Sequence, residues 1–438
     1  MSPAALLPEL LILAGAVAGL VTGLFTARER QWVTAWINAA GLGGAALTTM
    51  TSHDMSPFEG YAVDVVTNVA RITVSLATIL VLGLAAGWAR AQPRESELYT
   101  LISLAALGAI LMAGAADLLV LVAAYLLASI PAYALAGFAK DAAGTEAALK
   151  YYLMGAFLGV VMLAGVTLAY GHSGATSYPE TRAPAVAAVL LLGGLLFKAG
   201  GVPAHFWVPD VAQGASRPVA AFVTTVPKVG AFAALYRLAS DGVIDEPALF
   251  AVLAAATMTL GNLAAFHQDN VRRLLAYSTI SQAGYLLVPV AVAGRTELAA
   301  PALLYYLAAY AITNLGAFAV VVTAGADSLR EYAGLARRSP WAASALVVCL
   351  LGLVGTPPTA VFAGKLLMFA AAWDGGYAWL AVLAAANTVA SLFYYLRWIR
   401  PVFARQGAPG ERRVGAVAVI AAAGSVLLGV GAGLVLLA

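Results

Sequence analysis

Three lysines lie deep inside apolar stretches of the chain, where a cation is costly. Lys198, Lys228 and Lys365 each stand far from the ends of a hydrophobic run. A lysine at the centre of a bilayer costs roughly 2.5 to 3.5 kcal/mol on insertion scales, so three of them need a reason. A buried amine can load and release a proton as its surroundings change. The three lysines therefore predict a proton relay, with snorkelling or pairing for packing alone as the alternative.

Two of these lysines stand beside breaks in their hydrophobic runs, at residues 200–203 and 355–358. Lys198 comes five residues before Pro203, and Lys365 comes seven residues after Pro358. Irregular backbone at membrane depth persists only where it is buried in protein or lines a wet cavity. Secondary transporters build sites from paired broken helices in two halves of inverted topology. The pattern therefore predicts two discontinuous helices that bring water to the lysines.

His205 follows the first break by two residues and completes the set of candidate site residues. The unperturbed pKa of histidine is about 6.5, which suits proton transfer. A histidine that caps carbonyls freed by the break is an equal alternative. For Lys150, four residues after Glu146, pairing with that carboxylate and a role in the relay both stay open. Glu9 and Asp117, at the ends of apolar runs, are expected to be interfacial.

Polar residues without charge occur in two later spans, and most are expected to tie helices together. They are Tyr277, Ser278, Ser281, Gln282 and Asn314.

The elements that must position these residues are membrane spans. The chain of 438 residues is 62% hydrophobic and only 10% charged, and a transmembrane helix needs about 20 apolar residues. We predict an all-α polytopic membrane protein of fourteen helices, with the seventh and twelfth discontinuous. The predicted spans are 5–26, 31–49, 68–89, 97–115, 117–138, 146–170, 185–213, 217–240, 247–266, 271–293, 300–324, 339–373, 377–399 and 413–437.

Loop charges orient these spans, because basic residues stay on the side of synthesis. Alternate loops, beginning with the first, hold nearly all the arginines, and the opposite loops hold Asp54, Glu59, Asp64 and Asp241. Both termini are therefore expected on the outer side of the cell's inner (plasma) membrane. The basic loops contain Arg28, Arg30, Arg90, Arg94, Lys140, Arg217, Arg272, Arg273, Arg330, Arg337, Arg338, Arg400, Arg405, Arg412 and Arg413.

The two breaks divide the chain into two predicted five-helix repeats of inverted topology. Residues 1–96 form helices one to three, 97–240 the first half, 247–402 the second half, and 413–438 the last helix. With this topology both Lys198 and Lys365 lie on the outer side of their breaks.

The sequence places no cofactor on this chain. Cys349 is the single cysteine, so the chain cannot form an internal disulfide or hold an iron–sulfur cluster. No haem-attachment, dinucleotide-binding or Walker motif is present, and the histidines lack metal-ligand spacing. Any redox chemistry must belong to partner proteins. A net charge of +3 that comes from loop arginines gives no reason to expect nucleic acid.

Several segments resemble the antiporter-like subunits of respiratory complex I, and the N-type subunits of proton-pumping NADH:quinone oxidoreductase in particular. They include FKAGGVPAHFWVPDV from residue 197, DNVRRLLAYSTISQAGYLL from residue 269 and GTPPTAVFAGKLLMF from residue 355. The likeness also covers LLPELLIL at the start and EAALKYYLMGAF at 146–157. The Mrp sodium/proton antiporter subunits are more distant relatives with similar broken helices.

The resemblance implies a fourteen-helix subunit of a proton-translocating enzyme. Such a subunit moves protons along a buried row of charged groups, driven by quinone reduction elsewhere in the complex. Quinone, flavin and iron–sulfur clusters are then expected in partner subunits, and neighbouring membrane subunits are the partners. By motif, Lys198 matches the lysine of broken helix seven, Lys228 the connecting lysine of helix eight, and Lys365 the exit-side lysine of broken helix twelve.

One position departs from the family pattern. The family usually carries a glutamate on helix five in a motif like ELxSIP, and LLASIP at 126–131 has Leu126 there. No carboxylate occurs between Asp117 and Asp141. Two alternatives therefore stand beside proton translocation, namely a monovalent cation/proton antiporter subunit of the Mrp type and a divergent structural subunit that has lost pumping.

Overall fold

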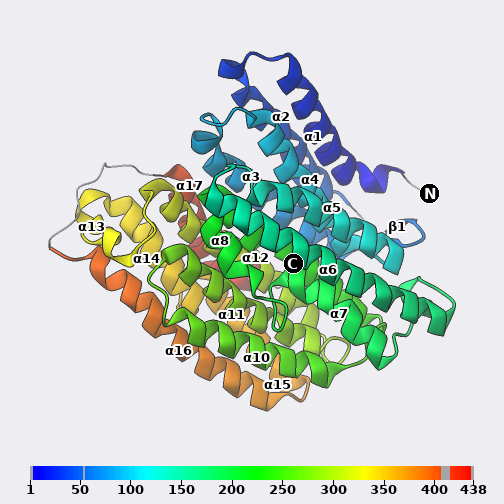
Figure 1. The fold of residues 1–438 in the computed structure, drawn as a ribbon. Coiled ribbons are helices and arrows are strands. Elements are labelled where there is room, and N and C mark those ends of the chain that lie inside the picture. The colour runs from blue at the N-terminus through cyan, green and yellow to red at the C-terminus, as the bar shows by residue number, and fades with distance from the viewer. Residues whose placement is uncertain (1–2, 53–54, 406–414, 436–438) are drawn as a thin grey trace. The chain divides into compact units, whose positions relative to one another are not determined.

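The structure is a computed structural model that describes residues 3–52, 55–405 and 415–435. Helices dominate these residues, as predicted (Figure 1). Contacts divide the chain into two units, which are residues 1–207 with 214–246 and residues 208–213 with 247–438. Asp54, Arg412 and Arg413, which contributed to the predicted loop charges, lie outside the described residues.

The first unit contains most of the helices before residue 246. Three of its helices begin directly after Asp64, Asp117 and Asp141, whose carboxylates accept backbone N–H groups of the first turn. The helices of this unit are α1 (Leu7–Phe25), α2 (Trp32–Thr49), α3 (Val65–Ala89), α4 (Glu95–Gly114), α5 (Leu118–Ala136), α6 (Ala142–Ser173), α7 (Ala185–Ala199) and α9 (Arg217–Ser240), with short 3-10 turns η1 (Pro3–Leu6), η2 (Arg28–Arg30) and η3 (Tyr178–Glu180).

A small β-hairpin in this unit was not predicted. Strands β1 (Met55–Phe58) and β2 (Tyr61–Val63) pair antiparallel between α2 and α3. Gly60 has a φ of +96°, a conformation that residues with a side chain rarely adopt, and it allows the tight turn. The strands are only four and three residues long, which is too short to show a strand pattern in the sequence. The sequence there therefore looks like a polar loop.

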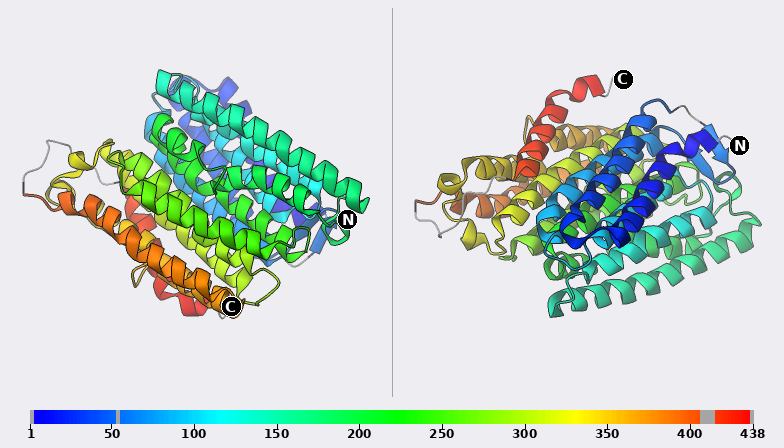
Figure 2. Two further views of the ribbon diagram at one scale, coloured as in Figure 1. Left: turned by 60° about the horizontal axis from the view of Figure 1, so that its bottom comes forward. Right: turned by 90° about the horizontal axis from the view of Figure 1, so that it is seen from above.

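The second unit contains α8 (Trp207–Gly214), of which residues 208–213 belong here, and the helices after residue 246. In this unit α17, red in Figure 2, packs against α12, α14 and α15. The helices are α10 (Pro247–Ala265), α11 (Val271–Ala291), α12 (Ala299–Ala324), α13 (Leu335–Arg338), α14 (Pro340–Val354), α15 (Ala360–Asp374), α16 (Ala378–Val402), α17 (Ala416–Val430) and α18 (Ala432–Val435), with the 3-10 turn η4 (Leu329–Tyr332).

The all-α, polytopic membrane fold predicted from hydropathy is confirmed. Ten helices of the described part are long and apolar enough to cross a membrane. These ten, with the 18-residue α2, the apolar α17 and the interrupted pairs α7–α8 and α14–α15, make the fourteen predicted spans. The first interruption falls at 200–206 and the second at 355–359, where the Gly/Pro breaks were expected.

Close packing fixes the helix that carries Lys228. A Cβ atom at Gly230 of α9 would lie 2.1 Å from the carbonyl oxygen of Ala109 in α4. Only glycine leaves room for this approach of two backbones. As a result α9 is held against α4 at a fixed depth, two residues from the buried lysine.

Candidate functional site

Lys198 ends the first half of the broken helix and is enclosed by aromatic rings. It lies in the last turn of α7 and is 1% exposed. Its ammonium donates a hydrogen bond of 3.3 Å to the carbonyl of Ala128 in α5. The same nitrogen lies 5.4, 5.9 and 6.0 Å from the ring centres of Tyr125, Tyr133 and Tyr151.

The three rings, which we call the tyrosine cage, favour a cation. The negative face of an aromatic ring attracts an ammonium, by about 2 kcal/mol where water is excluded. Pro131 lies three residues after Ala128 and interrupts the hydrogen bonds of α5 at this level, which leaves carbonyls there more open to a donor. Within the described residues, no carboxylate forms an ion pair with Lys198. The cage and one carbonyl therefore take the place of an anion.

Lys228 from α9 meets the end of the same half-helix. It is 1% exposed, and its ammonium donates a short hydrogen bond to the carbonyl of Ala199, the last residue of α7. The neighbouring carbonyl of Phe197 accepts a hydrogen bond of 2.8 Å from the indole of Trp207. Carbonyls at a helix C-terminus lack partners and carry a partial negative charge. Lys228 therefore binds where a cation is favoured.

Lys365 repeats this arrangement at the second break. It lies on α15, is 2% exposed, and donates a hydrogen bond of 2.9 Å to the carbonyl of Val354, the last residue of α14. It also donates to the hydroxyl of Thr388 at 3.0 Å and lies 4.1 Å from the ring centre of Tyr285. The carbonyl of Leu353 accepts a hydrogen bond of 2.9 Å from the side-chain amide of Gln282.

The two breaks therefore share a construction. In each, a half-helix ends, a buried lysine from another element caps its last carbonyl, and a second side chain caps a carbonyl one or two residues earlier. Trp207 does so at the first break and Gln282 at the second. The structure thus brings Lys198 and Lys228 together at one end of α7 in the first unit, while Lys365 occupies the corresponding place in the second unit.

Gly355 makes room for Lys365. Its φ of +93° ends α14 in a left-handed conformation. A Cβ atom there would lie 2.9 Å from Cδ of Lys365. Both the backbone conformation and the close approach require glycine at this position.

His205 lies in the segment between α7 and α8, as the sequence placed it. Its Nδ1 atom is buried and has no hydrogen-bond partner in the part of the chain that the structure describes. The carbonyl of Phe197, beside the break, accepts its hydrogen bond from Trp207 and not from His205. A buried imidazole nitrogen without a partner needs water or a ligand to satisfy it.

The comparisons with known proteins agree on one family. Residues 115–391 match the family described as NADH:quinone oxidoreductase/Mrp antiporter, transmembrane. The chain is 52% identical to NADH-quinone oxidoreductase subunit N of Mycobacterium sp. (strain JLS), over 99% of this chain and 97% of that protein. The chain belongs to this family.

Solved structures of the family have the same fold. A chain of respiratory complex I from Thermus thermophilus matches with a TM-score of 0.88 and 35% identity, over 98% of this chain and 99% of that one. A chain of the Mrp complex from Dietzia sp. DQ12-45-1b matches with a TM-score of 0.88 at 22% identity, over 100% and 96% of the two chains, which shows a shared fold alone. The resemblance inferred from motifs is therefore confirmed.

Leu126, where the family pattern has glutamate, does not face Lys198. Its side chain is 47% exposed, whereas the preceding Tyr125 is buried and supplies a wall of the tyrosine cage. The cage was not predicted, because its rings come from two helices and their meeting is a tertiary contact. The only signal in the sequence was the spacing of Tyr125 and Tyr133 on α5.

A buried ion pair in the first unit was also missed. Glu9 was expected to be interfacial, but it is 5% exposed and accepts 2.7 and 2.8 Å hydrogen bonds from Arg71 of α3. The hydroxyl of Tyr61 donates to the same carboxylate at 2.7 Å. Arg71 lies inside the span predicted at 68–89, so its charge was the available signal. The pair ties α1 to α3.

A second ion pair lies at the end of α9. Arg237 donates to Asp64 at 2.5 Å and to the carbonyl of Ala113 at 2.5 Å. Burial acts to raise the pKa of the Asp64 carboxyl, but the hydrogen bond and charge of Arg237 outweigh it and leave the pKa below its usual value. This contact holds the C-terminal end of α9 against α3 and α4.

Gln282 and Ser278, two of the polar residues expected to tie helices together, form such contacts in the second unit, whereas Ser281 Oγ has no partner among the described residues. The hydroxyl of Tyr306 donates to Gln282 at 2.6 Å, and Ser278 forms a short hydrogen bond with the hydroxyl of Tyr395. In the first unit, Lys150 pairs with Glu146 at 2.8 Å and is half exposed, as one of its two predicted alternatives required.

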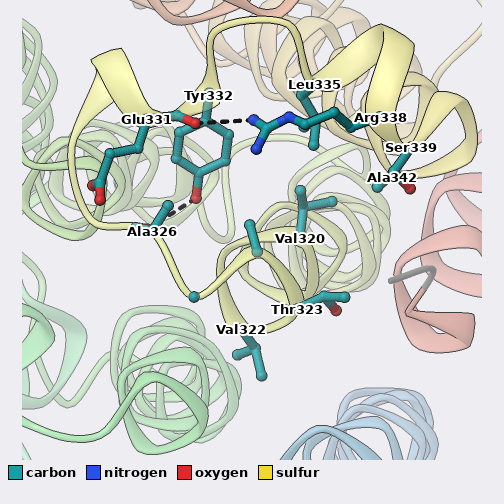
Figure 3. Close-up of a pocket in the computed structure, with 12 residues that line it drawn as sticks. Val320, Val322, Thr323, Ala326, Glu331, Tyr332, Leu335, Arg338, Ser339 and Ala342 are labelled. Atoms are coloured by element: carbon teal, nitrogen blue, oxygen red, sulfur yellow. Dashed lines mark hydrogen bonds between the residues drawn. The ribbon is translucent and has the colours of Figure 1, made fainter. Parts of the chain in front are cut away.

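A cavity of about 310 Å³ at the junction of α12, η4, α13 and α14 holds none of the candidate residues (Figure 3). Arg338 donates to the backbone carbonyl of Glu331 at 3.1 Å beside it, and Tyr332 donates to Ala326 at 3.1 Å. These bonds join backbone and side chains of the segment 326–338, between α12 and α14. The cavity is therefore separate from the lysine sites.

Proposed function

We propose that the chain is a proton-translocating, antiporter-like membrane subunit of a complex I type NADH:quinone oxidoreductase, and that Lys198, Lys228, Lys365 and His205 carry the protons. Relatives named as the N subunit of that enzyme support this proposal. The chain is an enzyme component only as part of that translocase. Quinone, flavin and iron–sulfur clusters belong to partner subunits, and both termini lie on the outer side of the inner (plasma) membrane.

The single observation that carries the proposal is the capping of each half-helix by a buried lysine. Lys228 binds the last carbonyl of α7, and Lys365 binds the last carbonyl of α14. A helix C-terminus stabilises a cation by up to about 2 kcal/mol in a partly buried geometry. Each lysine can therefore hold a proton in the membrane without a carboxylate, and loses that stabilisation if the half-helix moves.

The residues of the first break form a short sequence of proton carriers. Lys198 lies in the last turn of α7 and binds the carbonyl of Ala128 in α5, and Lys228 binds the carbonyl of Ala199 at the end of the same turn. His205, with a buried nitrogen that lacks a partner among the described residues, lies within the break between α7 and α8. We place the predicted inverted repeats, 97–240 and 247–402, around these two breaks.

The test uses the assembled complex reconstituted in vesicles. Lys228→Ala and Lys365→Ala are expected to lower the number of protons moved per NADH oxidised, while quinone reduction by the partner subunits continues. Lys150→Ala is the matched control, because Lys150 is a half-exposed lysine paired within its own helix. Undiminished proton transport in both buried-lysine variants would remove the proposal.

A structural subunit that has lost pumping is the second candidate, and Leu126 favours it. In that case even the unsubstituted complex moves fewer protons per NADH than the catalytic cycle of a pumping complex requires, and Lys228→Ala changes nothing. Sodium-dependent exchange in the same vesicles would instead favour the cation/proton antiporter. The proton count of the unsubstituted complex therefore separates the three functions.

A further inference from the structure

A groove of about 250 Å³ lies between α2 and α3 in the first unit, with Tyr99 of α4 at its side. It belongs neither to the lysine sites nor to the ion pairs described above. The helix faces that form it are built from positions three, four and seven residues apart, which lie on one side of a helix. Its lining includes Trp32, Trp36, Ala39, Gly83, Ala86 and Arg90.

Side-chain size explains the hollow. Ala39 of α2 faces Gly83 and Ala86 of α3, and these small residues leave space between two apolar helices. Trp32 and Trp36 border the space, and Trp36 is 69% exposed. Tryptophan is enriched where a membrane meets water, because its ring is apolar and its N–H is polar. The groove therefore runs from an interface into the apolar layer.

Positive charge gathers at the interfacial end. Arg90 follows the last residue of α3, is exposed, and makes no side-chain hydrogen bond within the described residues. Arg28 and Arg30 lie in the exposed turn just before Trp32, where α2 begins with no side-chain cap and no acidic residue in its first turn. Glu29 stands between them, and the buried Glu95 accepts a hydrogen bond from Tyr99. Among the residues that line the groove, Arg90 is the one with a charge, so the groove itself carries a positive group.

We propose that this groove binds a phospholipid with a negatively charged headgroup, whose phosphate lies at Arg90 and whose acyl chain lies along Ala39 and Gly83. Basic pockets between membrane helices on the inner side recognise anionic headgroups. Lipid binding at this site requires only that α2 and α3 lie in a membrane. The proposal is therefore independent of whether the chain transports protons.

The size of the groove argues for an acyl chain over a helix of another subunit. One turn of a helix, about 10 Å across and 5.4 Å long, fills roughly 400 Å³. The groove offers about 250 Å³. A helix could only cover it, whereas an extended hydrocarbon chain fits within it.

The test counts lipids that stay bound to the assembled complex. The complex is first stripped of lipid and then incubated with equal amounts of phosphatidylglycerol and phosphatidylcholine. After a wash, native mass spectrometry measures how many molecules of each lipid remain bound. The wild-type complex is expected to retain phosphatidylglycerol preferentially. Arg90→Gln should lower that preference about fivefold, because one basic residue near the surface contributes about that factor. Ala39→Leu fills the groove and should lower retention of both lipids.

Two controls match these variants. Ala40→Leu adds the same volume at the neighbouring exposed position outside the groove, and Arg337→Gln removes an exposed arginine of the second unit. Both should leave lipid retention at the wild-type level. The Arg90→Gln variant also allows a second measurement. Brominated phosphatidylglycerol should quench tryptophan fluorescence more than its phosphatidylcholine analogue in the wild type, and equally in Arg90→Gln.

Two results would overturn the proposal. In the first, Arg90→Gln and Ala39→Leu retain the wild-type lipids in the wild-type ratio. In the second, either variant loses a membrane subunit from the complex with its lipids unchanged, which would make the groove a subunit contact.

Discussion

At the scale of single residues, the tyrosine cage takes the place that an anion has in the family pattern. Lys198 has a carbonyl at 3.3 Å and three rings within 6.0 Å. The stabilisation by each ring depends on its π face and hardly on its hydroxyl. The ring of Tyr125, at 5.4 Å the nearest of the three, is therefore the part of that residue that acts on Lys198.

Substitution of Tyr125 separates ring from hydroxyl. Tyr125→Phe keeps the ring and should keep the number of protons moved per NADH. Tyr125→Leu removes roughly 1 to 2 kcal/mol of stabilisation from the ammonium, so the rate of proton transport should fall about tenfold. Tyr170→Leu, at an exposed tyrosine of α6, is the control. Equal losses in the Phe and Leu variants would assign the effect to the hydroxyl instead.

Gly355 offers a second test at this scale. Gly355→Ala places a methyl group against Cδ of Lys365 and should displace the ammonium from Val354. Gly376→Ala has a similar φ, +84° against +93°, but nothing lies within 4 Å of its new atom. Both variants bear the same backbone cost of about 1 to 2 kcal/mol. Proton transport per NADH should fall only in Gly355→Ala, and a matching fall in both would show backbone strain alone.

At the scale of elements, the buried ion pair of Arg71 and Glu9 fixes two helices that carry no site residue themselves. Arg71 and Glu9 join α3 to α1 with both charges excluded from water. Removal of one partner of such a pair leaves an uncompensated buried charge and costs about 3 to 5 kcal/mol, whereas apolar replacement of both can be nearly neutral. The pair therefore defines how α1 sits on α3 more than it adds to stability.

A double substitution tests that distinction. Glu9→Gln alone should lower the thermal unfolding midpoint of the detergent-solubilised complex clearly, and Glu9→Met with Arg71→Met should recover most of the loss. Glu29→Gln, at an exposed glutamate, should change nothing. A double variant as unstable as the single one would mean that the charges themselves hold the helices together.

The contact of Asp64 with Arg237 has a predictable pH dependence. The pKa of Asp64 is lowered in the folded protein from its ordinary 3.8, so the stabilisation is fully present above that value and is lost as pH falls through the lower folded pKa. Asp64→Asn should therefore lower the unfolding midpoint at neutral pH, and the difference from wild type should shrink once the pH falls below about 3.8 and vanish below the lower folded pKa. Asp245→Asn, at an exposed carboxylate, should show no such difference at any pH.

At the scale of the whole molecule, hydropathy and loop charge predicted the spans because each signal is local. The predicted span 217–240 coincides with α9, and the breaks at Gly200 and Gly355 follow from glycine and proline in the chain. The partners of the lysines could not be predicted, since Ala199 and Val354 offer backbone carbonyls that any residue carries. The tyrosine cage and the Arg71 pair likewise depend on which helices meet.

The repetition of one capped break in each unit leads to a prediction for the whole chain. If protons pass through both units in series, a block at either break stops the flow, and a second block adds nothing. Lys228→Ala, Lys365→Ala and the double variant should then share one residual number of protons per NADH. If each unit conducts separately, each single variant should keep about half of the wild-type number and only the double variant should lose it all. Proton counts in vesicles at equal NADH oxidation rates distinguish these outcomes for the capped lysines Lys228 and Lys365, one in each unit.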